Sequence, residues 1–334
     1  MIHVSIVVPT YNRRESLHRL LTALAEQTYP TNAFEVIVID DGSTDGTRDL
    51  LKSVRVPYSL GSFEQEHHGP AEARNFGASR AAGDLVLFLD DDVVPCRELI
   101  SVHVATHTAH GPLAVVIGPM SAPTDWQRSA WVRWEEEKLE WQYEAMRAGV
   151  WRATERQFYT ANSSLSRDLF ARAGGFDSTF KRAEDVELGY RLRNVGAQFV
   201  FTPEADVLHY ASRTFAAWCR TPYQYGRYDV IMTRDRGHEA LSRALQEFQA
   251  RHPLNRALSR LTVGRPTLLK PTLWILRAAV LGGDLVHSAR LTSSALSAIF
   301  NLLYWQGVCD ELGGRSVLGP SIAAGNLVPT NSSA

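Results

Sequence analysis

The chain has 334 residues, of which 45% are hydrophobic and 21% are charged. These values lie near the averages for soluble globular proteins and exclude a disordered, collagen-like or multi-span membrane protein. Lysine and arginine number 35 against 36 acidic residues, a net charge of −1, whereas dedicated nucleic-acid binders are strongly basic. We therefore expect no nucleic acid among the partners.

The cysteines and the N-terminal residues indicate the cellular compartment of the protein. Only Cys96, Cys219 and Cys309 are present, too few and too scattered for a disulfide framework or a thiolate zinc site. Met1 leads almost directly into the apolar run Val4–Val8, without the basic and long apolar regions of a secretory signal. Both features predict a cytoplasmic location.

Apolar runs alternate with helical patterns over about the first 120 residues. Leucines 17, 20, 21 and 24 recur at helical spacing, with Asn12 expected as the N-cap and Glu15 in the capping-box position. A second helix is expected over 71–82, between Pro70 and Gly83. Four short runs are predicted to be buried parallel strands, which together indicate an α/β layered sheet: Val4–Val8, Val36–Ile39, Leu85–Leu89 and Val115–Ile117.

Acidic residues follow two of these strands. Asp40 and Asp41 come after the second run, and Asp90, Asp91 and Asp92 come after the third. Ligands of open parallel sheets bind at the carboxyl ends of the strands, and clustered carboxylates repel one another unless a divalent cation offsets the repulsion. A solvated turn with a helix cap is the alternative for one such loop, but two acidic loops together favour a site for a metal and a diphosphate.

Two further segments carry charged residues for which the sequence allows more than one role. Arg74 lies in the 71–82 helix, where its guanidinium could meet a phosphate or pair with the acidic loop. Asp185 shares a helical face with Leu188 and Leu192. Its carboxylate either complements the helix dipole or serves as a general base.

Five ordered motifs together resemble the family 2 glycosyltransferases over about residues 3–210. The resemblance implies the GT-A (Rossmann-like) fold, a mixed and mostly parallel sheet with flanking helices, and inverting transfer of a sugar, hexosyl or related, from a nucleotide-diphosphate sugar to an acceptor hydroxyl. The motifs are Ile6–Arg13, Val38–Asp45, Gly69–Gly77, Leu87–Asp92 and Ala183–Leu192.

The resemblance also implies roles for individual residues. Pro9, Thr10, Tyr11 and Asp41 would hold the nucleotide base, with Arg74 also in the nucleotide-sugar site. Asp90 or Asp91 would contact the ribose. Asp92, Asp90 and His209 would bind Mg²⁺ or Mn²⁺. In the Glu184-Asp185 motif, Asp185 would be the catalytic base.

Two other functions compete with this prediction. A sugar nucleotidyltransferase would need a glycine-rich phosphate loop after the first strand, but that position reads Thr10-Tyr11-Asn12-Arg13. A catalytically silent nucleotide-sugar or glycan-binding module could keep the fold and lose the base. The presence of both Asp92 and Asp185 counts against it.

The C-terminal part differs in charge, since residues 1–215 sum to −7 and residues 216–334 to +6. We expect a catalytic domain over 1–215 and a mainly helical extension over 216–334. The apolar Leu268–Leu281 is too short and too charged for a membrane span. A helical stripe of Leu296, Phe300, Leu303 and Tyr304 either packs on the catalytic domain or, with Trp274 or Trp305, rests on an anionic membrane surface near a lipid-linked acceptor.

Overall fold

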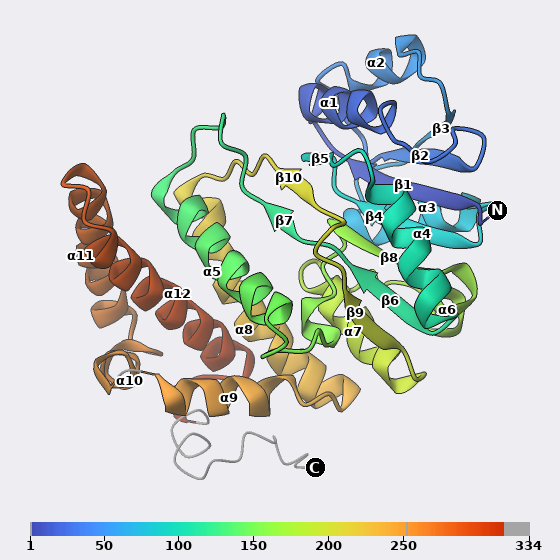
Figure 1. Cartoon of the computed structure of the whole chain (residues 1–334). Coiled ribbons are helices and arrows are strands. Elements are labelled where there is room, and N and C mark those ends of the chain that lie inside the picture. Colours follow the sequence, from blue (N-terminus) through green and yellow to red (C-terminus); the bar gives the residue numbers. More distant parts are fainter. Residues whose placement is uncertain (1, 252, 317–334) are drawn as a thin grey trace. The chain divides into compact units, whose positions relative to one another are not determined.

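The computed structural model describes residues 2–251 and 253–316 (Figure 1). Within these residues the chain forms two compact units. The first comprises residues up to 127 together with 136–211, and the second comprises 128–135 together with the residues from 212 onward. The division after residue 211 lies near the expected boundary at 215, but residues 128–135 join the second unit, which a single boundary does not describe.

A seven-stranded sheet forms the centre of the first unit. Its strand order is β3-β2-β1-β4-β8-β6-β9, and all neighbours are parallel except that β8 runs antiparallel to both β4 and β6. The mixed, mostly parallel sheet predicted from the sequence is confirmed, and all four predicted strands form. The strands are β1 (Val4–Thr10), β2 (Phe34–Asp40), β3 (Ser59–Glu64), β4 (Leu85–Leu89), β6 (Ala114–Ile117), β8 (Asn162–Ser166) and β9 (Gln198–Phe201).

Helices cover both faces of this sheet because alternate strand residues point to opposite sides. On one face, α1, α2 and α4 pack against Ile6, Val38 and Leu87. On the other, α3, α6 and α7 pack against Val7 and Phe88. The helices of this unit are α1 (Arg14–Leu24), α2 (Thr47–Ser53), α3 (Pro70–Arg80), α4 (Leu99–His110), α6 (Arg167–Arg172) and α7 (Glu184–Asn194), with the short 3₁₀ helix η1 (Glu155–Gln157).

The start of α1 differs from the prediction. Its leucine stripe is fully buried as expected, but Arg13 occupies the N-cap position without a side-chain cap. Asn12 adopts a left-handed conformation (φ 52°), and its side-chain oxygen accepts a hydrogen bond from the backbone N–H of Thr44. The capping-box prediction is therefore wrong, because the Asn12 side chain joins β1 to the loop after β2 instead.

A second, three-stranded sheet has the order β5-β10-β7. Its strands are β5 (Val93–Pro95), β7 (Met120–Ser121) and β10 (Val207–His209). β5 begins directly after the Asp90–Asp92 loop, so this sheet brings a distant part of the chain next to those acidic residues.

The second unit is helical, as predicted for the C-terminal region. It contains the start of α5 (Ala130–Arg147), a helix that continues into the first unit. Trp305 is only 2% exposed and lies in the core between α8, α9 and α12. The predicted contact of Trp305 with a membrane is therefore wrong, since the apolar stripe of α12 serves packing. The other helices are α8 (Phe215–Arg236), α9 (Ala240–Ala250), α10 (Pro253–Thr262), α11 (Pro266–Leu285) and α12 (Ala289–Glu311).

No helix of the described residues is both long enough and apolar enough to cross a membrane. The run Leu268–Leu281 lies within α11.

Helices α8 and α12 approach closely through two glycines. A Cβ added to Gly307 would lie 2.0 Å from the backbone oxygen of Tyr223, and one added to Gly226 would lie 2.0 Å from that of Tyr304. We expect Gly307→Ala to destabilise the protein by about 1–3 kcal/mol, because backbone atoms must move apart. Calorimetry should show a melting temperature lower by roughly 2–5 °C.

Gly282→Ala is the matched control for this prediction. Gly282 is also helical, and no atom lies within 4 Å of an added Cβ. Its substitution should leave stability equal or raise it by about 0.5–1 kcal/mol. Equal melting temperatures for both variants would show that the helices do not pack through Gly307.

Candidate active site

The predicted site residues from β1 and β4 meet at the carboxyl edge of the large sheet. The Thr10 hydroxyl donates a hydrogen bond of 2.7 Å to Asp91 across 81 residues of sequence. Arg13, which follows β1, pairs with Asp92 and lies 3.7 Å from Asp91. Burial is the main cause that raises the pKa of Asp91 to about 7, against the opposing effect of Arg13. The acidic loop is thus held by the last residue of the first strand and by an arginine that follows it.

His209 reaches the acidic loop through strand pairing. β10 runs antiparallel to β5 with His209 opposite Val93, which places its Nε2 atom 3.4 Å from Oδ1 of Asp92. Burial opposes ionisation of Asp92, but His209 and Arg13 outweigh it and hold the pKa of this carboxyl well below its usual range. Asp92 is therefore an ionised carboxylate next to an imidazole.

A buried polar network fixes the segment that leads into β10. The amide nitrogen of Asn162 donates to the backbone oxygens of Pro119 and Ala205, and its oxygen lies 3.1 Å from Nε2 of His103. Burial lowers the pKa of His103 to about 3, so this ring is neutral at ordinary pH. The network holds the start of β10, and hence His209, in register.

Arg74 connects two of the predicted motifs. Its guanidinium donates 2.7 Å to Asp90 and 2.8 Å to Glu184, and the side chain is nearly fully buried. Three residues further along α3, a Cβ on Gly77 would lie 2.4 Å from the Val7 side chain, so the helix packs tightly on β1 at this point. Arg74 thereby brings the β4 loop next to the first residue of α7.

The two acids that begin α7 are held differently. Glu184 is pinned by Arg74, whereas the hydrogen bond of Asp185 within the described structure comes from the backbone N–H of Val186. Asp185 is partly exposed, and Leu188 and Leu192 on the same face are fully buried. Burial is the main cause that raises the pKa of Asp185 to about 7, and the charge of Glu184 adds to it. A carboxyl with such a pKa suits proton transfer at neutral pH.

Asp41 organises the loop between β3 and α3. Its carboxylate accepts hydrogen bonds from the side chain of Gln65 and from the backbone N–H groups of His68 and Gly69. It also lies 2.9 Å from Nδ1 of His67. The contacts of the Asp41 carboxylate are therefore all with the loop that follows β3.

The remaining predicted base-binding residues are Pro9 and Tyr11. Pro9 lies within β1, opposite Ile39 of β2. Tyr11 is 43% exposed and stacks on His67 with ring centroids 4.0 Å apart. An exposed aromatic face next to Asp41 fits a site for a flat heterocycle.

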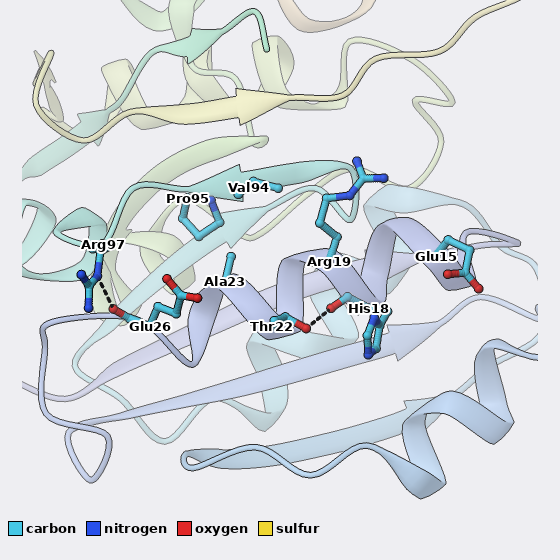
Figure 2. A pocket seen from close by; sticks show the side chains of 9 residues that line it. All are labelled: Glu15, His18, Arg19, Thr22, Ala23, Glu26, Val94, Pro95 and Arg97. Carbon is cyan, nitrogen blue, oxygen red and sulfur yellow. Dashed lines mark hydrogen bonds between the residues drawn. The ribbon is translucent and has the colours of Figure 1, made fainter. Parts of the chain in front are cut away.

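An open groove of about 500 Å³ runs along α1 and β5 (Figure 2). Figure 2 shows the side chain of Arg19 extending from α1 toward the strand that carries Val94. Arg19 also lies over the ring of Tyr210, 4.2 Å from its centroid. The predicted donor-site residues do not line this groove.

The residues around Asp92 fit a divalent cation that is shared with a substrate. A carboxylate oxygen and an imidazole nitrogen 3.4 Å apart can bind one ion from the same side. Within the described ranges, no group of three or more His, Cys, Asp or Glu side chains is gathered closely enough to hold a metal. Asp90, predicted as a further ligand, is engaged by Arg74. The remaining ligands would be phosphate oxygens and water, as is usual for Mg²⁺ in phosphate sites.

The sequence of the chain matches a known protein family. The profile of glycosyl transferase family 2 matches residues 5–174, just over half of the chain. The chain belongs to this family. Its sequence is 34% identical over 228 residues to validoxylamine A glucosyltransferase of Streptomyces hygroscopicus subsp. jinggangensis, covering 60% of this chain and 54% of that protein. The chain thus spans about half the length of the relatives it matches in sequence.

Solved structures of other glycosyltransferases share the fold. The mannosyltransferase PcManGT of Pyrobaculum calidifontis, in complex with GDP-Man and Mn²⁺, superposes with a TM-score of 0.59 at 19% identity and covers 91% of this chain and 87% of its own. Residues 1–349 of TarS from S. aureus, in complex with UDP-GlcNAc, give 0.57 at 17% identity and cover 97% and 93%. The GT-A fold expected from the family resemblance is confirmed.

Neither Arg13 nor His67 has a role predicted from the sequence. Arg13 stands within a motif of this family, and its position directly after β1 was the available signal. His67 belongs to a loop whose path depends on Asp41, so the sequence offered no comparable signal.

Proposed function

We propose that this family 2 chain is an inverting glycosyltransferase that moves a sugar from a nucleotide-diphosphate sugar to an acceptor hydroxyl. The ion-pair bridge of Arg74 is the observation that carries the proposal. Through it, the acidic loop after β4 and the start of α7, which lie far apart in the sequence of the first unit, form one site. That site combines groups for a diphosphate with a carboxyl of raised pKa.

In the proposed mechanism, Asp185 accepts the proton of the acceptor hydroxyl as the oxygen attacks the anomeric carbon. Glu184, held by Arg74, fixes the start of α7 and so the position of Asp185. Tyr11 and the loop around Asp41 bind the base, Asp90 or Asp91 contacts the ribose, and Arg13 lies where it can pair with a phosphate. A single displacement of this kind inverts the anomeric configuration.

Asp92 and His209 would hold the divalent cation, Mg²⁺ or Mn²⁺, with phosphate oxygens completing its coordination. Such an ion stabilises the negative charge of the departing diphosphate. The supporting observations are the ionised state of Asp92 and its proximity to the imidazole.

The donor can be identified by thermal shift with UDP-, GDP- and dTDP-sugars, each with and without Mn²⁺. PcManGT was solved with GDP-Man and TarS with UDP-GlcNAc, so these two donors come first. Transfer of radiolabelled sugar to a glycan, lipid-linked or other hydroxyl acceptor then tests the activity. Binding of a donor without transfer to any acceptor, and without its slow hydrolysis, would favour a silent binding module instead.

The raised pKa of Asp185 predicts a pH dependence. Because the base acts only when deprotonated, kcat/KM should rise with pH and level off above about 7, the pKa of this carboxyl. With the ordinary pKa of an aspartate, this rising limb of the pH profile would lie near pH 4. The measurement is kcat/KM between pH 5 and 9, and the limb should be absent in Asp185→Asn. A limb that persists in that variant would belong to another group.

We also propose that the chain works in the cytoplasm. Its three cysteines are all free thiols, as expected in a reducing compartment.

A further inference from the structure

The outer face of α11 is an apolar surface of unusual length. On a helical wheel, eight apolar residues of this helix fall within an arc of about 140° that carries no charged side chain. Trp274 is 72% exposed and Leu285 is 81% exposed, and the buried Leu269 and Val280 lie on the opposite side of the helix. We call this surface the α11 face. Its residues are Leu268, Pro271, Trp274, Ile275, Ala278, Leu281, Gly282 and Leu285.

Basic side chains border the α11 face. On the helical wheel, Lys270 and Arg277 lie within about 40° of one edge of the apolar arc. Both side chains are exposed. The only acidic residue of α11 is Asp284, and it pairs with Arg133 of the same unit. The border is therefore cationic, and the acid that could reduce its charge is already engaged.

The geometry points to an anionic lipid surface as the partner of the α11 face. An apolar face with a tryptophan and a basic border is the pattern of helices that lie in the plane of a membrane interface. The basic residues would contact lipid phosphates while the apolar residues enter the boundary between headgroups and acyl chains. No helix in the described parts of the chain is suited to span a membrane, so this contact is peripheral.

A second copy of the chain fits the α11 face less well. A two-fold contact places the same patch on both partners, so the basic borders of the two copies would come together without acidic partners. Lipid phosphates neutralise that border instead.

Co-sedimentation of the full chain with vesicles tests this inference. Binding is expected to vesicles of equal parts phosphatidylglycerol and phosphatidylcholine, to be much weaker with phosphatidylcholine alone, and to fall between roughly 0.02 M and about 0.5 M salt. Lys270→Gln with Arg277→Gln should weaken binding by about 25-fold. Trp274→Ser with Ile275→Ser should weaken it by at least about tenfold, and so should Leu281→Ser with Leu285→Ser.

Trp141→Ser is the matched control, since Trp141 is a comparably exposed tryptophan of the first unit. It should bind vesicles like the parent chain. Circular dichroism melts establish that each variant is folded, and sedimentation velocity without lipid reports self-association. No binding at low salt, or binding unchanged by both apolar pairs, would overturn the inference. So would a dimer of the parent chain that the same substitutions dissociate.

Discussion

Asp185→Asn is expected to lower kcat by about 10²–10⁴-fold while donor affinity stays within about twofold of the parent. The amide keeps the shape of the side chain but cannot take a proton from the acceptor hydroxyl at neutral pH. Asp185 is well placed for this role because its carboxylate accepts only the hydrogen bond of Val186 within the described structure, and its pKa lies near neutrality. The measurement is kcat with saturating donor and acceptor, together with donor affinity by calorimetry.

Glu184→Gln distinguishes the two acids of this motif. The Glu184 carboxylate is engaged by Arg74, so this variant should disturb the position of α7 and lose less of kcat than Asp185→Asn. Asp168→Asn, an exposed acid of the same unit paired only at 3.9 Å with Arg172, should leave kcat unchanged. A larger loss for Glu184→Gln than for Asp185→Asn would assign the base to Glu184.

Asp92→Asn should weaken binding of a nucleoside diphosphate in the presence of Mn²⁺ by at least about 10²-fold. An amide does not supply the anionic oxygen that a hard divalent cation prefers, and the change also removes the negative charge that Arg13 and His209 face. The backbone oxygen of Asp92, which accepts a hydrogen bond from Tyr210, is retained. The fold should therefore persist.

Calorimetric titration of UDP and of GDP, each with and without Mn²⁺, measures this effect. The metal-dependent part of the affinity should disappear in Asp92→Asn, and direct Mn²⁺ binding by electron paramagnetic resonance should fall in parallel. Asp49→Asn, an exposed acid on α2, should behave like the parent. Unchanged metal-dependent affinity in Asp92→Asn would place the cation at other residues.

The sequence by itself determined the parallel core of the first unit. The apolar runs of β1, β2 and β4 and the leucine stripe of α1 are read directly from their periodicity. The acidic residues at the ends of β2 and β4 could be placed at one edge, because parallel strands end on the same side of a sheet. The position of Asp185 in the first turn of α7, on the face of Leu188 and Leu192, also followed from helical spacing and agrees with the structure.

Only the tertiary structure decided which of these groups meet. β8 reads Asn-Ser-Ser-Leu-Ser, a segment without an apolar run, yet it fills the place between β4 and β6 because its polar side chains find buried partners such as His103. The contacts of Arg74 with Glu184 and of Arg13 with Asp92 span 110 and 79 residues. Local patterns do not encode contacts of that range.

The two apolar helices α11 and α12 also show what local sequence patterns cannot determine. Both carry tryptophans in apolar stripes, but Trp305 is buried and Trp274 is exposed. Periodicity fixes which side chains share a face of a helix. Which face is buried depends on the neighbouring helices, here α8 and α9 around α12, and that arrangement exists only in the folded chain.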